Sequence, residues 1–311
     1  MRNYPLVSIV LATYNGEKFL HQQIDSLLAQ SYPNIEIIAI DDASVDDTAK
    51  ILKGYATQHQ HIKVYINETN LGFVRNFDKG CGLSTGKFIA LCDQDDYWHP
   101  DKLSRLVEAI GERSMIYCDS YLCNQDLKKI GKKASDIVNF RSFDNCLQQA
   151  IFCRIYGHAT LFTRALYTLA HPFIQAIPHD WWLSYTATLL NGITYLPEPM
   201  VYYRQHSTNL IGAVGGKKRK HLNQNKKEKR RFEKINIRSR INDFYNICPQ
   251  DKIKEKKVLF KLLISYKDFS LLNNLRRVLI FLQYRNTFLM AKKHSALHRF
   301  FFCFKIFATI I

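Results

Sequence analysis

The chain of 311 residues is long enough for one large domain or two modest ones, and a composition of 47% apolar and 13% aromatic residues excludes a disordered protein. The formal net charge of +17 is unevenly distributed. Residues 1–210 carry 19 Lys and Arg against 21 Asp and Glu, whereas residues 211–311 carry 25 against 6. We therefore expect the first part to handle a small ligand and the second to meet a polyanion, which is either nucleic acid or an anionic membrane surface.

The cysteines and the apolar runs indicate the compartment. None of the eight cysteines belongs to a C-x-x-C pair and most lie inside apolar runs, which predicts buried, reduced thiols and a cytoplasmic protein. The apolar run at 6–12 is too short for a signal peptide and is expected to be a buried strand. No run reaches about 18 uncharged apolar residues, the length that a membrane-spanning helix requires.

Strand-like and helix-like segments alternate along the first hundred residues. Apolar runs at 6–12, 35–42, 63–67 and 87–93 predict strands, and amphipathic stretches at 17–30, 45–58, 73–83 and from Pro100 predict helices. This β-α-β order predicts an α/β fold with a mostly parallel central sheet and helices on both faces. Ligands of such sheets bind at the carboxyl ends of the strands, so the polar residues that follow the strands are the candidates for a site.

The pattern changes in the second half of the chain. It is mixed from about residue 142 to residue 203, and after the GAVGG segment at 212–216 the composition becomes rich in Lys and Phe. We predict an α/β domain at 1–211 and a basic, amphipathic helical extension at 212–311.

The strongest single motif is the acidic run D-Q-D-D that begins at Asp93, directly after an apolar strand. In an extended segment residues i and i+2 point to the same side, so Asp93 and Asp95 can direct two carboxylates at one point. A hard divalent cation such as Mg²⁺ or Mn²⁺ relieves their repulsion and prefers oxygen ligands. The alternative is a solvated loop that caps the helix starting near Pro100.

A second acidic pair, Asp41 and Asp42, ends the strand at 35–42. Its place at the carboxyl end of a neighbouring strand predicts that it reaches the same crevice, where a carboxylate can accept hydrogen bonds from a base N–H or a ribose hydroxyl. Helix capping is the alternative for this pair as well.

Four motifs follow one another in the first hundred residues. They are V-S-I-V-L-A-T-Y-N-G at 7–16, I-I-A-I-D-D-A-S at 37–44, N-L-G-F-V-R-N at 70–76 and S-T-G-K-F-I-A-L-C-D-Q-D-D-Y-W at 84–98. Together they resemble family 2 glycosyltransferases of the GT-A fold, a Rossmann-like fold for nucleotide-diphospho-sugars, and in particular rhamnosyltransferase-like members that decorate bacterial surface polysaccharides. The resemblance covers about the first two thirds of the chain and leaves the tail uncovered.

The resemblance implies a role for each of these motifs in holding a nucleotide-diphospho-sugar. Asp95 is implied as a metal ligand, with Asp93 beside it in a D-x-D site for Mg²⁺ or Mn²⁺. A guanidinium at Arg75 suits the nucleotide or its diphosphate, because it offers two charge-assisted hydrogen bonds to phosphate oxygens. The residues implied to bind the nucleotide-sugar are Thr13, Tyr14, Asp41, Asp42, Arg75, Asp93 and Gln94.

The motif P-H-D-W-W-L at 178–183 resembles the segment that carries the general base in related enzymes. Asp180 is then the residue that removes a proton from the acceptor hydroxyl, and partial desolvation beside the two tryptophans would raise its pKa toward the working range. Trp181 and Trp182 are candidates for contact with the acceptor sugar, although a core role for at least one of them is expected. A helix N-cap followed by core tryptophans is the alternative.

Two histidines complete the implied site. The segment Y-Y-R-Q-H-S-T-N at 202–209 resembles the closing loop of the family, in which His206 would contact the metal or the diphosphate and Arg204 a phosphate. His158, which precedes an apolar run, is a candidate for the acceptor side.

The basic tail mixes Lys and Arg clusters with apolar stretches that charges interrupt. This pattern disfavours spanning and favours helices that lie in the interface of an anionic membrane. The Lys-rich run at 217–220 is accompanied by no zinc-finger spacing or aromatic-basic readout motif, so we expect no nucleic acid partner. The expected location is cytoplasmic, peripheral on the inner face of the plasma membrane.

The residues and the resemblance together imply an inverting glycosyltransferase that acts on a hydroxyl of a glycan or lipid-linked acceptor in polysaccharide biosynthesis. The resemblance implies rhamnose or a hexose as the sugar and a dTDP- or UDP-linked donor. One alternative is a sugar nucleotidyltransferase, which also needs paired carboxylates and metal but normally carries a Gly-rich N-terminal loop with basic residues. The other is a non-catalytic nucleotide-sugar-binding scaffold, which would bind the donor without turnover.

Overall fold

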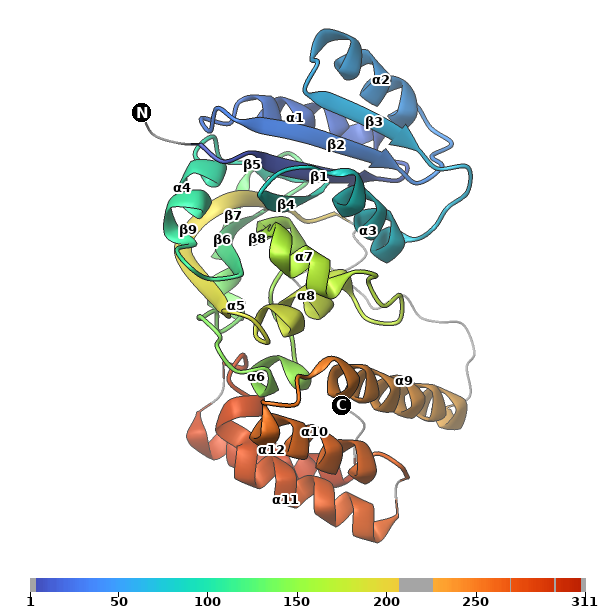
Figure 1. Cartoon of the computed structure of the whole chain (residues 1–311), viewed down its shortest axis with the longest axis vertical. Coiled ribbons are helices and arrows are strands. Elements are labelled where there is room, and N and C mark those ends of the chain that lie inside the picture. The colour runs from blue at the N-terminus through green and yellow to red at the C-terminus, as the bar shows by residue number, and fades with distance from the viewer. Residues whose placement is uncertain (1–3, 207–225, 269, 294, 309–311) are drawn as a thin grey trace. The chain divides into compact units, whose positions relative to one another are not determined.

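The computed structural model describes residues 4–206, 226–268, 270–293 and 295–308 (Figure 1). The chain divides into two compact units. The first comprises residues 1–142 and 155–216, and the second comprises residues 143–154 and 217–311. The predicted boundary after residue 211 lies outside the described residues, and the grouping of residues 143–154 with the tail was not expected from the sequence.

The first unit is an α/β structure built on one nine-stranded sheet, in the order β3-β2-β1-β4-β8-β6-β9-β5 with β7 paired to β6. Strands β1 to β4 are mutually parallel, and β8 joins β4 and β6 in the antiparallel sense. The strands are β1 (Val7–Thr13), β2 (Ile35–Asp41), β3 (Ile62–Ile66), β4 (Phe88–Asp93), β5 (Tyr97–Trp98), β6 (Met115–Cys123), β7 (Lys129–Lys133), β8 (Thr160–Thr163) and β9 (Ile193–Arg204).

Helices cover both faces of the parallel part, as predicted. Their bounds are α1 (Glu17–Leu28), α2 (Thr48–Gln58), α3 (Phe73–Leu83), α4 (Lys102–Ala109), α5 (Ala134–Ile137), the 3₁₀ helix η1 (Gly157–Ala159), α7 (Arg164–Ala170) and α8 (His179–Ala187).

Strand β1 shows why two layers of helices form. Its side chains alternate, and Val7, Ile9 and Leu11 join a buried core with apolar residues of α1, α2 and α4. On the other face α3 lies close to the sheet at Gly80, where an added Cβ would be 2.4 Å from Val10 Cγ1. The alternation of one strand thus fixes the two layers of helices on either side of the sheet.

At the opposite end of the sheet, the buried carboxylate of Glu36 in β2 links β1, β3 and the segment before β4 by hydrogen bonds. Glu36 Oε1 accepts hydrogen bonds from Ser8 Oγ, Thr85 N and Thr85 Oγ1 at 2.7, 2.6 and 2.8 Å, and Oε2 accepts one from Lys63 Nζ at 3.0 Å. Burial alone would raise the pKa of Glu36, but these hydrogen bonds outweigh it and lower the pKa to about 2.

We expect Glu36→Gln to lower the free energy of unfolding at pH 7 by about 2 kcal/mol, because the amide replaces an ionised acceptor of four hydrogen bonds. A carboxylate whose folded pKa is depressed stabilises the protein above its unfolded pKa, and that contribution is lost as the pH falls from about 4.5 toward 2. Denaturant unfolding at pH 7 and pH 3 checks both points. An equal loss of stability at the two pH values would contradict the assignment.

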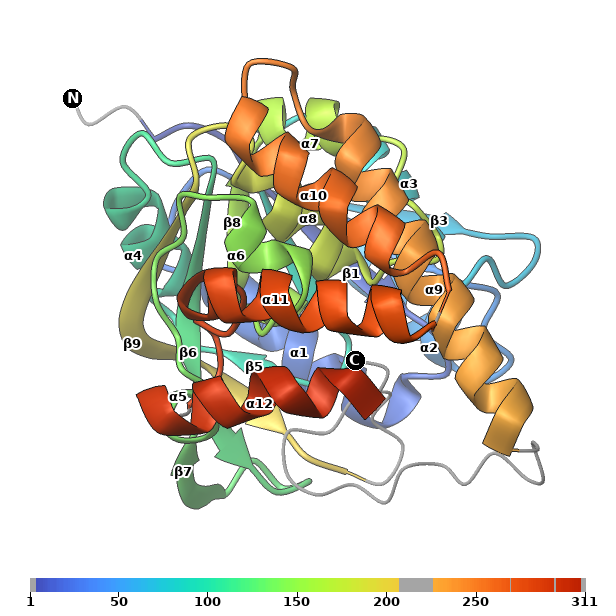
Figure 2. The same ribbon diagram turned by 90° about the horizontal axis from the view of Figure 1, so that it is seen from below.

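The second unit is helical. It contains α9 (Lys226–Ile247), α10 (Ile253–Ser265), α11 (Leu271–Phe288) and α12 (Ala296–Ala308), together with the short α6 (Leu147–Ala150) from the middle of the chain. Figure 2 shows α11 and α12 side by side, and α10 packs on α9 and α11. Among the described residues, none of the helices combines the length and the apolar character needed to cross a membrane.

Residues 143–154 are held in the second unit by specific side chains. Asn145 Nδ2 donates to Glu255 Oε1 at 2.8 Å. Lys292 Nζ lies 4.0 Å from the ring centroid of Phe152 and 3.9 Å from that of Phe302. The tail therefore folds around a segment that the sequence places inside the α/β part.

Candidate functional site

The candidate site lies at the carboxyl ends of three neighbouring parallel strands. Thr13 ends β1, Asp41 ends β2 and Asp93 ends β4, with Thr13 in register with Asp41 and Ala12 in register with Asp93. The acidic motifs that the sequence analysis singled out therefore lie at one edge of the sheet, as expected for a ligand crevice.

The polar residues at the ends of β1 and β2 bond to the protein itself. Asp41 is fully buried and accepts hydrogen bonds from Thr13 Oγ1 at 3.0 Å and from Ser44 Oγ at 2.5 Å. Asp42 accepts from Asn67 Nδ2, Leu71 N and Gly72 N at 2.8, 2.8 and 2.9 Å. These carboxylates hold the loops at this edge of the sheet, and a direct contact with a nucleoside stays a prediction.

Three other residues that were predicted to bind the nucleotide-sugar differ in accessibility. The side-chain amide of Gln94 accepts from Tyr14 N at 2.8 Å and donates to Tyr14 O at 3.0 Å, so it ties the β1 loop to the acidic loop. The Tyr14 side chain is 47% exposed. Arg75 is exposed in the first turn of α3, and among the described residues it makes no hydrogen bond or ion pair. Tyr14 and Arg75 are thus accessible to a ligand.

The acidic loop brings three carboxylates together, of which the sequence analysis had used two. Asp93 is 44% exposed, Asp95 is 20% exposed and Asp96 is fully buried. Asp96 Oδ1 accepts from Arg204 N at 3.0 Å, whereas Asp96 Oδ2 accepts no hydrogen bond among the described residues. A buried carboxylate oxygen without a donor is costly and suggests a missing partner.

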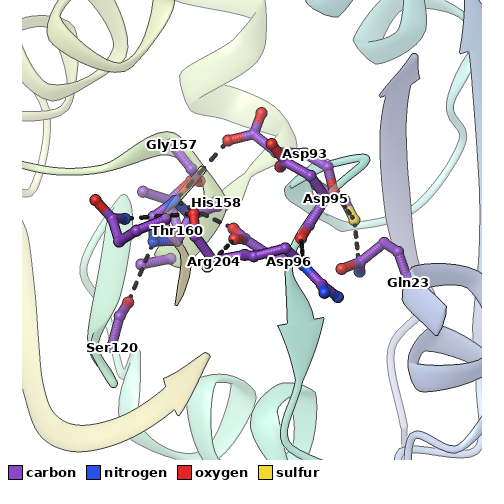
Figure 3. Close-up of polar contacts among 12 residues, drawn as sticks. Gln23, Asp93, Asp95, Asp96, Ser120, Gly157, His158, Thr160 and Arg204 are labelled. Atoms are coloured by element: carbon purple, nitrogen blue, oxygen red, sulfur yellow. Dashed lines mark hydrogen bonds and ion pairs between the residues drawn. The ribbon is translucent and has the colours of Figure 1, made fainter. Parts of the chain in front are cut away.

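His158 lies beside this acidic loop, and its contact with the acceptor stays a prediction (Figure 3). Its Nδ1 is 3.4 Å from Asp96 Oδ2 and 3.8 Å from Asp93 Oδ2, and its Nε2 is 3.2 Å from Ser120 Oγ. One ligand atom from each of Asp93, Asp96 and His158 lies within 4.8 Å of the others, a spacing that could hold a metal ion.

The electrostatics of the loop follow from burial and from like charges. Partial burial, together with the carboxylates of Asp95 and Asp180, raises the pKa of Asp93 to about 7. Burial and the same kind of repulsion raise the pKa of Asp96 well above its usual range. Burial lowers the pKa of His158 to about 3, so its imidazole is neutral and able to act as a ligand.

The end of β9 contributes the predicted His206. Its Nε2 lies 2.8 Å from Asp95 Oδ2, and its ring is 5.0 Å from that of Phe19. The guanidinium of Arg204 is buried and donates to Asp95 O at 2.6 Å, to Gln125 O and to Gln22 Oε1 at 2.7 Å. Arg204 therefore ties the end of β9 to the acidic loop, and its contact with a phosphate stays a prediction.

Helix α8 carries the predicted base. The half-buried Asp180 accepts from Trp181 N at 2.7 Å, and burial raises its pKa to about 6. Trp182 is 3% exposed and donates from Nε1 to Ala170 O at 2.7 Å, so it belongs to the core rather than to an acceptor site. His179 is also buried, against the ring of Phe77 at 4.4 Å. Asp180 and the half-buried Trp181 remain as the candidates on this helix.

The sequence analysis missed Lys102 and the role of Asp96. Lys102 is fully buried and donates from Nζ to His158 O at 2.6 Å. Its position could have indicated a special role. Lys102 shares the buried face of α4 with Leu103 and Leu106, and a lysine is unusual on such a face. The fold and the acidic residues at the carboxyl edge of its sheet are those of a glycosyltransferase of the GT-A type.

Comparison with known proteins agrees with that class. Residues 8–169 match the family model for glycosyl transferase family 2, which is more than half of the chain. The chain belongs to glycosyltransferase family 2. An uncharacterized glycosyltransferase of Haemophilus influenzae is 26% identical over 292 residues, 87% of this chain and 90% of that protein. The putative teichuronic acid biosynthesis glycosyltransferase TuaG of Bacillus subtilis is 35% identical over 113 residues, 36% of this chain and 45% of TuaG.

Solved structures show the same fold. TarS 1-349 of S. aureus, in complex with UDP-GlcNAc, is 14% identical with a TM-score of 0.58, covering 97% of this chain and 90% of that one. The mannosyltransferase PcManGT of Pyrobaculum calidifontis, in complex with GDP-Man and Mn²⁺, is 18% identical with a TM-score of 0.50, covering 63% of this chain and 55% of that one. At these identities the likeness concerns the fold.

Proposed function

We propose that this glycosyltransferase moves a sugar, rhamnose or a hexose, from a nucleotide-diphospho-sugar to a hydroxyl of a glycan or lipid-linked acceptor during the synthesis of a bacterial polysaccharide. The observation that carries the proposal is the meeting of Asp93, Asp95 and Asp96 at the carboxyl edge of the sheet, with Asp180 close enough to raise the pKa of Asp93. The name of TuaG and the sugar nucleotides bound by TarS and PcManGT support the substrate class.

The donor would lie along the carboxyl edge of the sheet. Tyr14 and Arg75 are the accessible candidates for contact with the nucleoside and the diphosphate. In this proposal Thr13, Asp41 and Asp42 hold the loops that border the nucleoside. Gln94 would keep the β1 loop and the acidic loop together through its two hydrogen bonds to Tyr14.

The carboxylate and imidazole groups of the site fit a divalent cation. Asp96 Oδ2 accepts no hydrogen bond within the part of the chain that the structure describes, and a cation would satisfy it and relieve the mutual repulsion of the carboxylates. Oxygen and imidazole ligands suit Mg²⁺ or Mn²⁺. Asp95, with Asp93 and His206, would hold the ion from the open side of the crevice, and Asp96 and His158 offer a second, buried set. When bound, such an ion neutralises the charge of the departing diphosphate.

Asp180 would act as the general base in a single displacement with inversion. Its carboxylate accepts the proton of the acceptor hydroxyl while that oxygen forms a bond to the anomeric carbon. The bond between the anomeric carbon and the diphosphate oxygen breaks in the same step, and the nucleoside diphosphate leaves with the bonding electrons. No covalent intermediate between sugar and enzyme is required.

The test is calorimetric titration of the full chain with dTDP, UDP and GDP, each with and without Mn²⁺, followed by a transfer assay with the sugar donors of the nucleotide that binds. We expect one nucleotide to bind in a metal-dependent manner and its sugar nucleotide to be consumed. Binding without turnover on any acceptor would favour the scaffold alternative, and binding of none of the three would contradict the proposal.

The tail would attach the enzyme to the inner face of the plasma membrane. Nine large apolar side chains of α11 and α12 are exposed at helical spacing, although charge dominates the rest of the tail. We call them the tail apolar residues: Leu271, Leu272, Leu275 and Leu279 of α11, and Leu297, Phe300, Phe301, Phe304 and Phe307 of α12. Exposed apolar stripes among basic residues fit helices that lie in an anionic interface.

We expect the full chain to bind vesicles that contain phosphatidylglycerol and to bind phosphatidylcholine vesicles weakly. The double variant Leu279→Ser and Phe301→Ser should weaken binding at least about tenfold, because each side chain loses about 1.5–3 kcal/mol of burial in the interface. Ile130→Ser, which changes an exposed apolar residue of β7, is the control. Equal vesicle binding by the double variant and the control would contradict the assignment.

A further inference from the structure

Lys102, the first residue of α4, is a fully buried lysine. Its side chain has no exposed surface, although an ammonium group is costly to remove from water. Its Nζ donates to the backbone oxygen of His158 at 2.6 Å and lies 3.1 Å from the ring centroid of Trp98. A charge-assisted hydrogen bond and a cation–π contact therefore hold the group in one place.

The turn that Lys102 holds is a junction between the two halves of the site. This turn is η1, and its His158 ring faces Asp96 at 3.4 Å and Asp93 at 3.8 Å. The preceding Gly157 lies against helix α8, since an added Cβ at Gly157 would be 2.7 Å from His179 Nε2. His179 adjoins Asp180 in the sequence, so one short turn touches both the acidic loop and the start of the helix that bears the proposed base.

We propose that Lys102 is a positioning residue for sugar transfer, which acts through η1. By fixing the His158 carbonyl it holds the His158 ring against the acidic loop, and it holds Gly157 against the start of α8. It thereby sets the acidic loop and Asp180 in the relative position that transfer requires. This inference rests on the proposed function, because it assigns Lys102 to the same site.

The experiment compares Lys102→Met and Lys102→Gln with the unaltered full chain. Methionine has a similar shape without a donor, whereas glutamine keeps a shorter donor. We expect Lys102→Met to lower kcat about 10- to 100-fold while the donor KM changes less than about threefold, and Lys102→Gln to recover part of the loss. Metal-dependent nucleotide binding by calorimetry should stay close to that of the unaltered protein. The melting temperature should fall by less than about 10 °C, because Lys102→Met leaves a single buried carbonyl oxygen without its donor.

Two further variants keep the test decisive. Lys50→Met makes the same chemical change at a lysine that is 82% exposed and should leave all readings unchanged. Gly157→Ala should reproduce the loss of kcat with Lys102 intact, because the added methyl group meets His179.

Three results would overturn the inference. One is an unchanged kcat in Lys102→Met, and another is an unchanged kcat in Gly157→Ala. The third is a loss of activity that comes together with loss of nucleotide binding and a fall in melting temperature well beyond about 10 °C, since Lys102 would then be part of the core alone. An unaltered protein that binds no nucleotide and transfers no sugar would instead refute the proposed function, so the two failures are distinguishable.

Discussion

Asp180→Asn should lower kcat by about 10²- to 10⁴-fold while nucleotide binding stays within a factor of about two. The amide cannot accept the proton of the acceptor hydroxyl, and a positioned general base contributes rate enhancement of this size. In the proposed site other residues hold the sugar nucleotide, so we expect the variant to bind the nucleotide with nearly unchanged affinity. Initial rates at saturating donor, together with calorimetry of the nucleotide, measure the two quantities separately.

The matched control is Asp144→Asn, which makes the same change at an exposed aspartate. It should leave kcat within a factor of two. A folded Asp180→Asn protein with near-normal kcat would remove Asp180 from the mechanism. A loss of nucleotide binding in the same variant would assign Asp180 to the donor instead.

The pH dependence of the reaction follows from the same residue. Burial raises the pKa of Asp180 to about 6, and a base acts only when it is deprotonated. We therefore expect kcat to be level above about pH 7 and to fall about tenfold for each pH unit below 6. The residual rate of Asp180→Asn should lack this acid limb, and an acid limb that persists in the variant would assign the titration to another group.

The parallel half of the fold was predictable because its signals are local. Strands β1 to β4 are apolar runs bounded by polar residues, and α1 to α4 carry apolar residues at helical spacing, so the order of elements can be read along the chain. The prediction of an α/β fold with helices on both faces is confirmed. Seven of the eight cysteines are buried, as expected for structural thiols.

The second half was less predictable because its structure depends on distant pairing. Strand β9 contains Pro197 and Pro199, and its register with β6 shifts near Asp119, so neither strand shows a clean alternation. Residues 143–154 carry no pattern that links them to the tail. Their place in the second unit depends on contacts such as that of Phe152 with Lys292, far apart in the sequence.

The same distinction applies to the site. The acidic residues at the ends of β2 and β4 were found from local motifs, because the carboxyl ends of parallel strands meet at one edge. The contact of His158 with the acidic loop was not predicted, since nothing in the sequence indicates that β8 lies beside β4 and brings η1 to that loop. Lys102 was missed for a related reason, because its partner is a backbone oxygen 56 residues away.

Asp95→Asn should weaken metal-dependent nucleotide binding about 100-fold or more and should raise the Mn²⁺ concentration needed for transfer. A neutral amide is a poorer ligand for a hard cation, and changes even beyond the direct ligands cost about 10- to 100-fold in metal affinity. Calorimetry of the nucleotide with and without Mn²⁺ measures the effect. Asp101→Asn, at a side chain that is 54% exposed, is the matched control and should bind normally.

The companion variant Asp96→Asn separates the two possible ligand sets. Asp95 pairs with His206 on the open side, whereas Asp96 lies with His158 in the buried set. If Asp95 and His206 hold the cation, Asp95→Asn should weaken metal-dependent nucleotide binding more than Asp96→Asn does, because Asp96 is then not a direct ligand. Normal Mn²⁺ dependence in Asp95→Asn together with its loss in Asp96→Asn would contradict this assignment and would move the cation to Asp93, Asp96 and His158.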